Sequence, residues 1–221
     1  MALVFAGGAI QVTARLRARV GQLLDPYVVA ADSGAALAVA LGFQPHVIVG
    51  DFDSIDPQLA SKLKHHSRFE RHSRAKDATD GQLALECALR QSPERLVLVG
   101  FLGGPRLDQA LANVFLLTTL PVPALLLDGD NEALLLHTGE RWTWTPEPDE
   151  VISLLPVGGD AHGVTTDGLL WPLNGERLVF GHTRGISNQP NALQVTVRLE
   201  RGLMLVTRHF PGAGRAVRSV R

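Results

Sequence analysis

Two aspartates separated by a single residue form the most distinctive acidic pair of this sequence. Asp51 and Asp53 lie in the segment GDFDS, directly after the apolar run Val47–Val49. Two carboxylates on one short loop suit Mg²⁺, which takes oxygen ligands and commonly bridges carboxylates to substrate phosphates. The segment therefore predicts a magnesium site in a protein that handles phosphorylated ligands.

Further charged residues stand where helices are expected to begin. Asp77 and Asp80 flank one such start in KDATDGQLALE, and Asp108 opens another helix beside Arg106. A guanidinium forms paired hydrogen bonds with phosphate, and Asp80 can extend the metal site. For Asp80 and Asp108 the structural alternative is a first-turn acid that stabilises its helix.

Standard nucleotide and zinc fingerprints are absent from the sequence. It contains no GxxxxGK[ST] loop, and no GxGxxG joins a first strand to a first helix. No HExxH or Cys/His spacing occurs, and we interpret the basic stretch SKLKHHSRFERHSRAK as a solvated connector. Nucleotide binding must therefore be argued from how the loops are placed.

Short apolar runs alternate with helical patterns over the first half of the chain. Nearly continuous apolar runs are typical of strands covered on both faces, and this alternation predicts parallel strands with helical crossovers. The expected strands are Leu3–Ala6, Tyr27–Ala31, Val47–Val49 and Arg95–Val99, and the expected helices are Val12–Leu24, Ala35–Leu41, Pro57–Lys64, Thr79–Arg90 and Arg106–Leu120.

Each of these strands ends in small or acidic residues. The carboxyl ends of parallel strands share one edge of the sheet, and α/β folds bind ligands at that edge. Glycine there lets backbone amides approach a phosphate, although a glycine after a strand can also serve only a tight turn. The loops expected at this edge contain Gly7-Gly8, Asp32-Ser33-Gly34, Gly50–Ser54 and Gly100–Gly104.

The alternation of apolar runs and helical patterns ends after Pro121-Val122-Pro123. From there on, short strand-like runs are separated by turn residues. This half predicts a mostly antiparallel all-β sandwich or barrel. We place an α/β domain at residues 1–137 and the sandwich at 138–221, with a solvated tail from Pro211. Within the sandwich, Trp171 can stack on a flat cationic ligand or pack in the core.

Composition argues against nucleic-acid-binding and membrane proteins. The formal net charge of −1 provides no general attraction to nucleic acid or to an anionic membrane. No apolar stretch approaches the roughly 18–20 residues that span a bilayer. The single cysteine, Cys87, lies in an apolar helical pattern, which indicates a buried reduced thiol. We therefore expect a soluble cytoplasmic protein that binds neither nucleic acid nor membrane.

Several segments together resemble the thiamine pyrophosphokinase family. They occur in the family's order between residues 31 and 189, and the combination of GDFDS with DxTD is specific where either motif alone would be weak. The segments are ADSGAALAVALGFQPHVIVGDFDS, KDATDGQLALECAL, GFLGGPRLDQALANV, SLLPVGGDAHGVTTDGLLWPL and GISNQ.

This resemblance implies a fold, a reaction and an assembly. It implies an α/β catalytic domain followed by a β-sandwich, and transfer of a diphosphate from ATP to the hydroxyl of thiamine, with Mg²⁺ as cofactor. It also implies a homodimer in which thiamine binds between the catalytic domain of one subunit and the sandwich of the other. The alternatives are a diphosphokinase for another hydroxymethyl compound, such as a pterin, and a non-catalytic sensor of thiamine or nucleotide.

The resemblance also assigns roles to individual residues. Asp51, Asp53 and Asp80 match the acids around Mg²⁺, the diphosphate and the thiamine hydroxyl, and Arg106 joins them as a catalytic residue. Thiamine contacts are expected from Thr165, Thr166, Trp171, Ser187 and Asn188. Nucleotide contacts are expected from Asp32, Ser33, Gly34, Asp77, Gly103, Gly104 and Asp108.

Overall fold

The computed structural model describes residues 1–211, so the tail expected after Pro211 lies outside the described residues. The chain divides into two compact units, the first ending at Gly129 and the second beginning at Asp130. The segment 130–137, which we had placed in the α/β domain, belongs to the second unit. Among the described residues, no helix is both long and apolar enough to cross a membrane.

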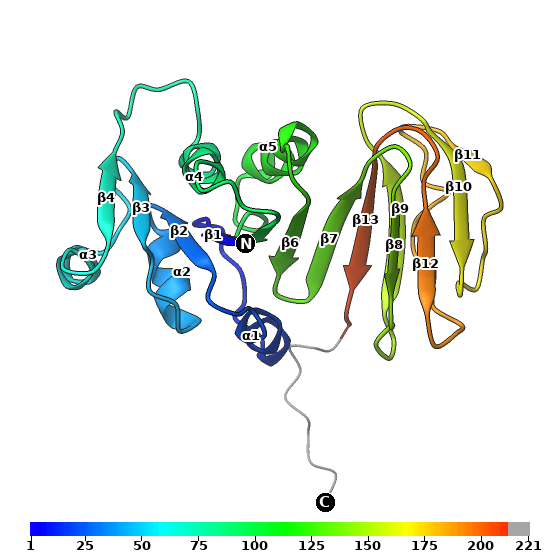
Figure 1. Ribbon diagram of the computed structural model, residues 1–221, viewed down its shortest axis with the longest axis horizontal. Coiled ribbons are helices and arrows are strands. Elements are labelled where there is room, and N and C mark those ends of the chain that lie inside the picture. The colour runs from blue at the N-terminus through cyan, green and yellow to red at the C-terminus, as the bar shows by residue number, and fades with distance from the viewer. Residues whose placement is uncertain (212–221) are drawn as a thin grey trace, which may run out of the picture. The chain divides into compact units, whose positions relative to one another are not determined.

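A parallel sheet organises the first unit (Figure 1). Its strands lie in the order β4, β3, β2, β1, β5, β6, and every neighbouring pair in this series is parallel. All the strands predicted for the first half of the chain are present. The bounds are β1 Ala2–Phe5, β2 Tyr27–Ala31, β3 Val47–Gly50, β4 Arg68–Arg71, β5 Leu96–Val99 and β6 Ala124–Asp128.

Helices cover both faces of this sheet (Figure 1). On one face α1 (Ala14–Gly21), α2 (Gly34–Ala40) and α3 (Pro57–Leu63) share a hydrophobic cluster with the strands. On the other lie α4 (Asp80–Leu89) and α5 (Leu107–Leu116), which is followed by a short 3₁₀ turn. Burial on both faces explains why the inner strands β1, β2, β3 and β5 are apolar at nearly every position and do not alternate.

Strand β4 was not predicted. We had interpreted its segment as a solvated connector, yet Arg68–Arg71 pairs in parallel with β3 at the edge of the sheet. Phe69 is its only apolar residue, and the Phe69 ring lies 5.2 Å from that of Phe52. The exposed edge tolerates charged side chains at the other positions, which hides the strand from a search for apolar runs.

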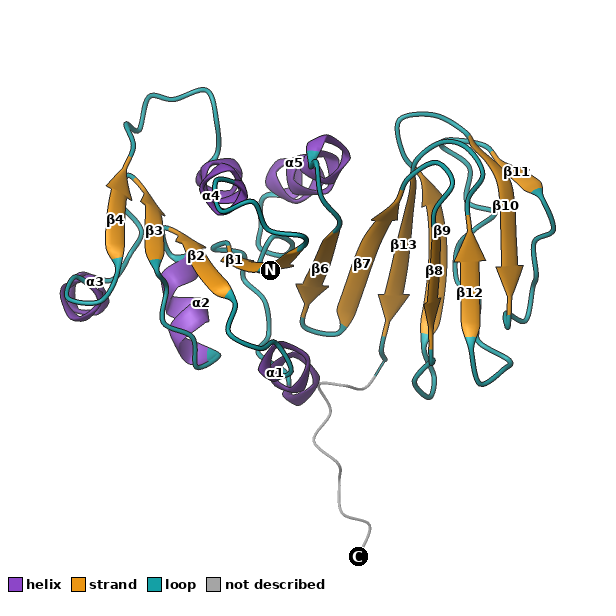
Figure 2. Cartoon of the chain, viewed as in Figure 1, coloured by secondary structure: helices purple, strands orange, loops and turns teal. Residues whose placement is uncertain are grey.

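Antiparallel strands form all the regular structure described in the second unit (Figure 2). The strands pair in the orders β7-β13-β9 and β11-β10-β12-β8. The bounds are β7 Asn131–Leu136, β8 Arg141–Trp144, β9 Val151–Pro156, β10 Ala161–Asp167, β11 Glu176–Leu178, β12 Val195–Arg198 and β13 Met204–His209.

One hydrophobic core joins the two groups of strands. Ile152 and Val206 from the first group and Val164 and Val195 from the second are 0% exposed and belong to a single cluster. The predicted fold class, a mostly parallel α/β domain followed by an all-β sandwich, is therefore confirmed. Strand β10 was not identified from its apolar pattern, because Gly163 sits where its pairing with β11 shifts register, and such irregularity obscures the alternation.

Candidate active site

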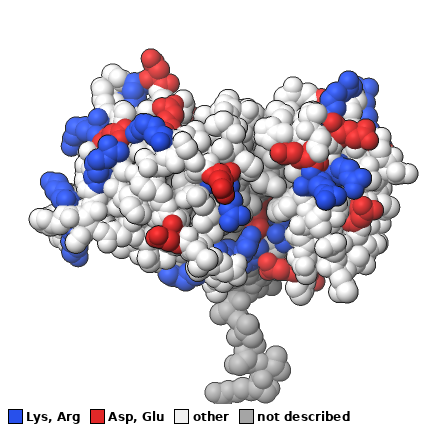
Figure 3. Space-filling view, viewed as in Figure 1, with Lys and Arg blue, Asp and Glu red and all other residues white. Residues whose placement is uncertain are grey.

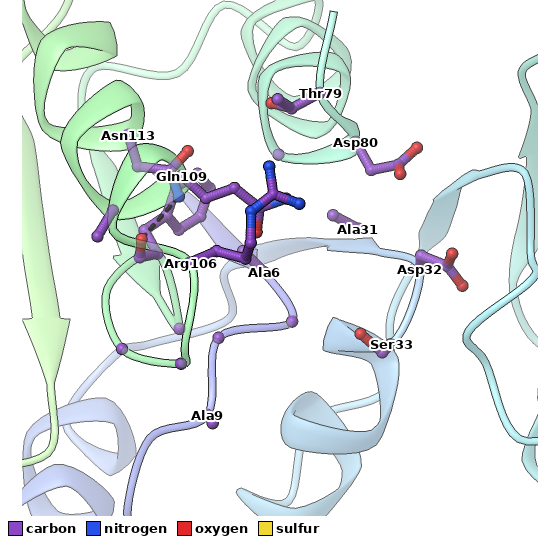
Figure 4. A pocket seen from close by; sticks show the side chains of 18 of the residues that line it. Ala6, Ala9, Ala31, Asp32, Ser33, Thr79, Asp80, Arg106, Gln109 and Asn113 are labelled. Atoms are coloured by element: carbon purple, nitrogen blue, oxygen red, sulfur yellow. Dashed lines mark hydrogen bonds between the residues drawn. The ribbon is translucent and has the colours of Figure 1, made fainter. Parts of the chain in front are cut away.

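A cavity of about 300 Å³ opens at the carboxyl edge of the parallel sheet. The loops after β1, β2, β3 and β5 all line it, together with the first turns of α4 and α5. Figure 4 shows Asp32 and Asp80 on one side of this cavity and Arg106, Gln109 and Asn113 on the other. The structure thus brings together the loops that the prediction of parallel strands had placed on one edge.

Three carboxylates converge beside this cavity. Asp32, Asp51 and Asp53 each offer an oxygen within 4.8 Å of the other two. Asp32 is only 5% exposed, and its Oδ1 has no hydrogen-bond partner among the described residues. Burial raises the pKa of Asp32, although hydrogen bonds from Ser54 act in the opposite direction. A buried carboxylate that has an unpartnered oxygen and lies beside two further carboxylates fits a hard divalent cation.

The loop after β3 holds its acids in place by its own backbone. The amide of Asp53 donates to Asp51 Oδ1 at 3.1 Å, and this hydrogen bond lowers the pKa of Asp51. Phe52 between them has a φ of 65°, an uncommon backbone conformation for a bulky residue. A Cβ on Gly50 would lie 3.1 Å from Asp32 Cβ and 3.2 Å from Asp80 Oδ1, so glycine leaves room for these acids to approach.

Asp80 takes its position from the start of α4. The Thr79 hydroxyl accepts a hydrogen bond from the amide of Gln82 at 3.2 Å, which caps the helix and makes Asp80 its first residue. Asp80 Oδ1 accepts a hydrogen bond from Lys76 Nζ at 2.6 Å. The compact cluster therefore holds Asp32 as its third member, while Asp80, expected as a metal ligand, forms a salt bridge beside it.

A second charged pair lies across the cavity at the start of α5. Arg106 Nε donates to Asp108 Oδ1 at 2.8 Å, and hydrogen bonds from Arg106 lower the pKa of Asp108 to about 2. Both side chains are exposed. Further along the helix, Asn113 Nδ2 donates to the carbonyl of Phe101 at 2.6 Å and ties α5 to the loop after β5.

In the second unit, the residues expected to contact thiamine support a single loop. The hydroxyls of Thr165 and Thr166 accept hydrogen bonds from the amides of Gly175 at 3.1 Å and Leu173 at 2.9 Å. Thr166 is buried, so its hydroxyl serves this loop. The loop presents Trp171 with 58% of its surface exposed, which excludes the alternative of core packing for this side chain within the described structure.

The segment Ser187-Asn188 approaches the same loop from another direction. Asn188 is buried and forms backbone hydrogen bonds with Ile152 of β9, both at 2.8 Å. Ser187 is exposed, has a φ of 63°, and donates its amide to Ser153 Oγ at 3.1 Å. The turn between these residues therefore directs the Asn188 side chain inward and leaves the Ser187 side chain outside.

Comparison with known proteins gives concordant matches along the chain. The family model for the thiamin pyrophosphokinase catalytic domain matches residues 23–124, and the model for its vitamin B1 binding domain matches residues 143–204. A thiamine pyrophosphokinase of Bacillus subtilis is 30% identical over 181 residues, which cover 80% of this chain and 84% of that protein. The chain belongs to the thiamine pyrophosphokinase family.

Solved structures of thiamine pyrophosphokinases have the same fold as this chain. The Bacillus subtilis structure gives a TM-score of 0.82 at 26% identity and covers 94% of this chain and 98% of that chain. The Geobacillus thermodenitrificans structure gives 0.79 at 26% identity and covers 97% and 100%. The Candida albicans structure, at 16% identity, shows the fold alone, with a TM-score of 0.75 and coverage of 95% and 88%.

The thiamine pyrophosphokinase motifs predicted only part of the cavity wall. Gly34, Asp77 and Asp108 are not among the lining residues, and a Cβ on Gly34 would lie 2.5 Å from the Phe5 carbonyl, which indicates a packing role for this glycine. Asp51 lies in the carboxylate cluster rather than in the wall. The predicted residues that do line the cavity are Asp32, Ser33, Asp53, Asp80, Gly103, Gly104 and Arg106.

Gln109 and Asn113 also line the cavity, and the sequence analysis did not identify them. With Arg106 and Ala110 they recur at the spacing of one helix face. This face of α5 therefore lines the cavity, and its helical spacing is readable in the sequence of this thiamine pyrophosphokinase family member.

Proposed function

We propose that this protein transfers the diphosphate of ATP to the hydroxyl of thiamine and releases thiamine diphosphate and AMP. It is an ATP-dependent diphosphotransferase of the thiamine pyrophosphokinase family, and both family domains are matched. The main support for this reaction is the cavity at the sheet edge, which has carboxylates on one side and Arg106 on the other. The matches do not favour the pterin enzyme or the non-catalytic sensor.

The reaction depends mainly on positioning the two substrates and on compensating the negative charge of the phosphates. The thiamine hydroxyl attacks the β-phosphorus of ATP, the bond from that phosphorus to the α-phosphate oxygen breaks, and AMP departs with the electron pair. Arg106 lies where it can bind phosphate oxygens, and its guanidinium geometry suits that contact. Asp80, at the cavity wall, is our choice for the base that orients the hydroxyl and accepts its proton.

The carboxylate cluster supplies the candidate magnesium site. Asp51 and Asp53 would hold the ion together with Asp32, whose buried Oδ1 lacks another partner in the described structure, and Asp80 stands next to them. Bound Mg²⁺ would neutralise phosphate charge and favour attack at phosphorus. The predicted magnesium dependence rests on this fit.

The second unit supplies the candidate thiamine contacts. We infer that Trp171 stacks on the thiamine ring system, because it is exposed at the tip of a loop that Thr165, Thr166 and Asn188 hold in place. Ser187 is exposed beside this loop and remains a candidate for a direct polar contact.

A homodimer with its active sites at the subunit interface is part of this proposal. It is supported by an apolar stripe on α5, where Leu107, Leu111 and Phe115 recur every fourth residue and are 71%, 46% and 56% exposed. A second copy of the chain is the partner that the family resemblance implies. The buried free thiol of Cys87 is consistent with the cytoplasmic location that we expect.

A product analysis tests the proposed function. Purified protein is incubated with Mg²⁺, ATP and thiamine, and thiamine diphosphate, thiamine monophosphate, AMP and ADP are resolved by chromatography. We expect thiamine diphosphate and AMP in equal amounts. Thiamine monophosphate with ADP would show attack at the γ-phosphorus and contradict the proposed step. Folded protein that binds ATP but forms no thiamine-dependent product would direct attention to a pterin substrate and then to a sensor.

A further inference from the structure

The loop between β4 and α4 places two cations against carboxylates of the candidate magnesium site. Lys76 Nζ lies 2.6 Å from Asp80 Oδ1, and Arg74 Nη2 lies 3.6 Å from Asp53 Oδ2. Both cations come from one short segment, while their partners come from the start of α4 and from the loop after β3. This loop therefore neutralises acids that Mg²⁺ would also neutralise.

Helix stability does not explain the position of Lys76. Its ammonium pairs with the first residue of α4, where the positive end of the helix dipole disfavours a cation. The Lys76 side chain is also only 16% exposed, and a partly buried ammonium is unfavourable unless it is paired. The ammonium is therefore held at this position by its carboxylate partner and not by the field of the helix.

The electrostatic influence of the loop extends to Asp51. The positive charges of Lys76 and Arg74 lower the pKa of Asp51, in addition to the larger effect of the Asp53 backbone hydrogen bond. Arg71 Nη1 also donates to the Asp51 carbonyl at 3.1 Å. In Figure 3 basic and acidic side chains lie next to one another on the face of the first unit that it shows.

A second, shallower cavity lies between this loop and the acids. It has a volume of about 420 Å³ and is lined by Asp51, Asp53 and the segment 71–74. Asp53 lines both this cavity and the main one, so the two share a wall at the candidate metal site. A chain of phosphates bound beside the carboxylates would lie within reach of the basic loop.

We propose that Lys76, assisted by Arg74, is a phosphate-binding residue that exchanges its carboxylate partner for the transferred diphosphate when Mg²⁺ binds. This inference rests on the proposed function. Bound Mg²⁺ would compensate part of the negative charge that Lys76 and Arg74 now compensate, and this would weaken their ion pairs with Asp80 and Asp53. Magnesium-bound ATP is still anionic overall, and the released cations favour its phosphates over the four nearby carboxylates.

The proposal makes two binding predictions of opposite sign for Lys76→Met. Removing the competing cation tightens binding of Mn²⁺ alone several-fold, because the carboxylates keep their full negative charge. The same change weakens binding of ATP in the presence of Mg²⁺ by about tenfold or more, as expected when one charge-assisted hydrogen bond is lost. Titration calorimetry without thiamine measures the ATP affinity, and the relaxation rate of water protons measures Mn²⁺ binding.

Further variants separate this role from a structural one. Arg74→Gln should shift both affinities in the same directions by smaller factors, because Arg74 is 86% exposed and its ion pair is long. Lys76→Arg should retain most of the ATP affinity. Lys64→Met removes the same charge from an exposed position after α3 and should change neither affinity. If Lys76→Met does not fold, Arg74→Gln tests the proposal with the same pair of titrations.

Two results would overturn the proposal. A Lys76→Met protein that binds Mn²⁺ and ATP as the unaltered protein does, or that binds both more weakly, would show that Lys76 only maintains the fold of the loop. A different result would contradict the proposed function. That result is an unaltered protein that forms no thiamine diphosphate, whatever these titrations show.

Discussion

The side chain of Asn188 forms two hydrogen bonds with the backbone of Trp171, a residue on a different loop of the second unit. It donates to the Trp171 carbonyl at 2.7 Å and accepts from the Trp171 amide at 3.1 Å. An asparagine side chain can match both groups at once, because it carries a donor and an acceptor. The exposed indole is therefore held by a buried amide that need not touch the ligand itself.

Asn188→Ala should raise the KM for thiamine by about tenfold, because the unpaired Trp171 backbone no longer fixes the indole. The kcat should change less, since the reacting groups lie in the first unit. Steady-state rates at saturating ATP measure both constants. Asn174→Ala removes an exposed asparagine from the same loop and should leave both unchanged. An unchanged KM in Asn188→Ala would contradict the positioning role.

Asp53→Ala and Asp80→Ala should each reduce formation of thiamine diphosphate by at least about a hundredfold, as is typical when a group that stabilises transition-state charge is removed. Both side chains are partly exposed, so the variants should remain folded. Circular dichroism and the melting temperature check the fold. Near-normal turnover in either folded variant would remove that residue from the proposed mechanism.

Asp32→Asn should stabilise the protein in the presence of a chelator at neutral pH. Burial raises the pKa of Asp32, so the folded state binds more protons than the unfolded state just above the usual pKa. Stability therefore decreases as pH rises from the unfolded pKa, near 3.8, through the raised folded value. An amide at this position removes that pH-dependent cost.

The same variant should lose its response to metal. Added Mg²⁺ should raise the melting temperature of the unaltered protein, because a cation that binds only the folded state stabilises it. Asp32→Asn should show little of this rise. Differential scanning fluorimetry with and without Mg²⁺ measures the shift, and an equal shift in both proteins would exclude Asp32 from the metal site.

Arg208→Met should destabilise the second unit by about 3–5 kcal/mol, the usual cost of leaving buried acids without their partner. Arg208 donates to Glu150 at 2.7 and 2.9 Å and to Glu132 at 3.1 Å, and all of these side chains are buried. Urea unfolding measures the change. Arg177→Met breaks an exposed pair with Asp160 and should cost far less stability, so equal losses in the two variants would contradict this prediction.

Phe115→Glu should convert the proposed dimer into monomers, because it places a charge in the apolar stripe of α5. Sedimentation velocity over a range of protein concentrations measures the assembly. Gln91→Glu, which introduces the same charge at an exposed position after α4, serves as the control. A monomeric unaltered protein would reject the dimer, and a dimeric Phe115→Glu protein would place its interface elsewhere.

The parallel strands of the first unit and the location of the site follow from local sequence. Four apolar runs that end in glycine or aspartate predict parallel strands with ligand-binding loops at one edge, and the structure contains that arrangement. The pattern is readable because complete burial of a strand requires apolar residues at every position. Its loops are equally readable, since close backbone approach favours glycine and metal binding requires acids.

Side-chain partnerships were decided only by tertiary structure. Nothing local indicates that Asn188 reaches Trp171, that Lys76 turns to Asp80, or that Asp32 joins the pair in GDFDS. The edge strand β4 and the irregular strand β10 were missed for a related reason, since neither has a regular apolar pattern. Sequence periodicity reports burial within one element, whereas these contacts depend on how separate loops meet in space.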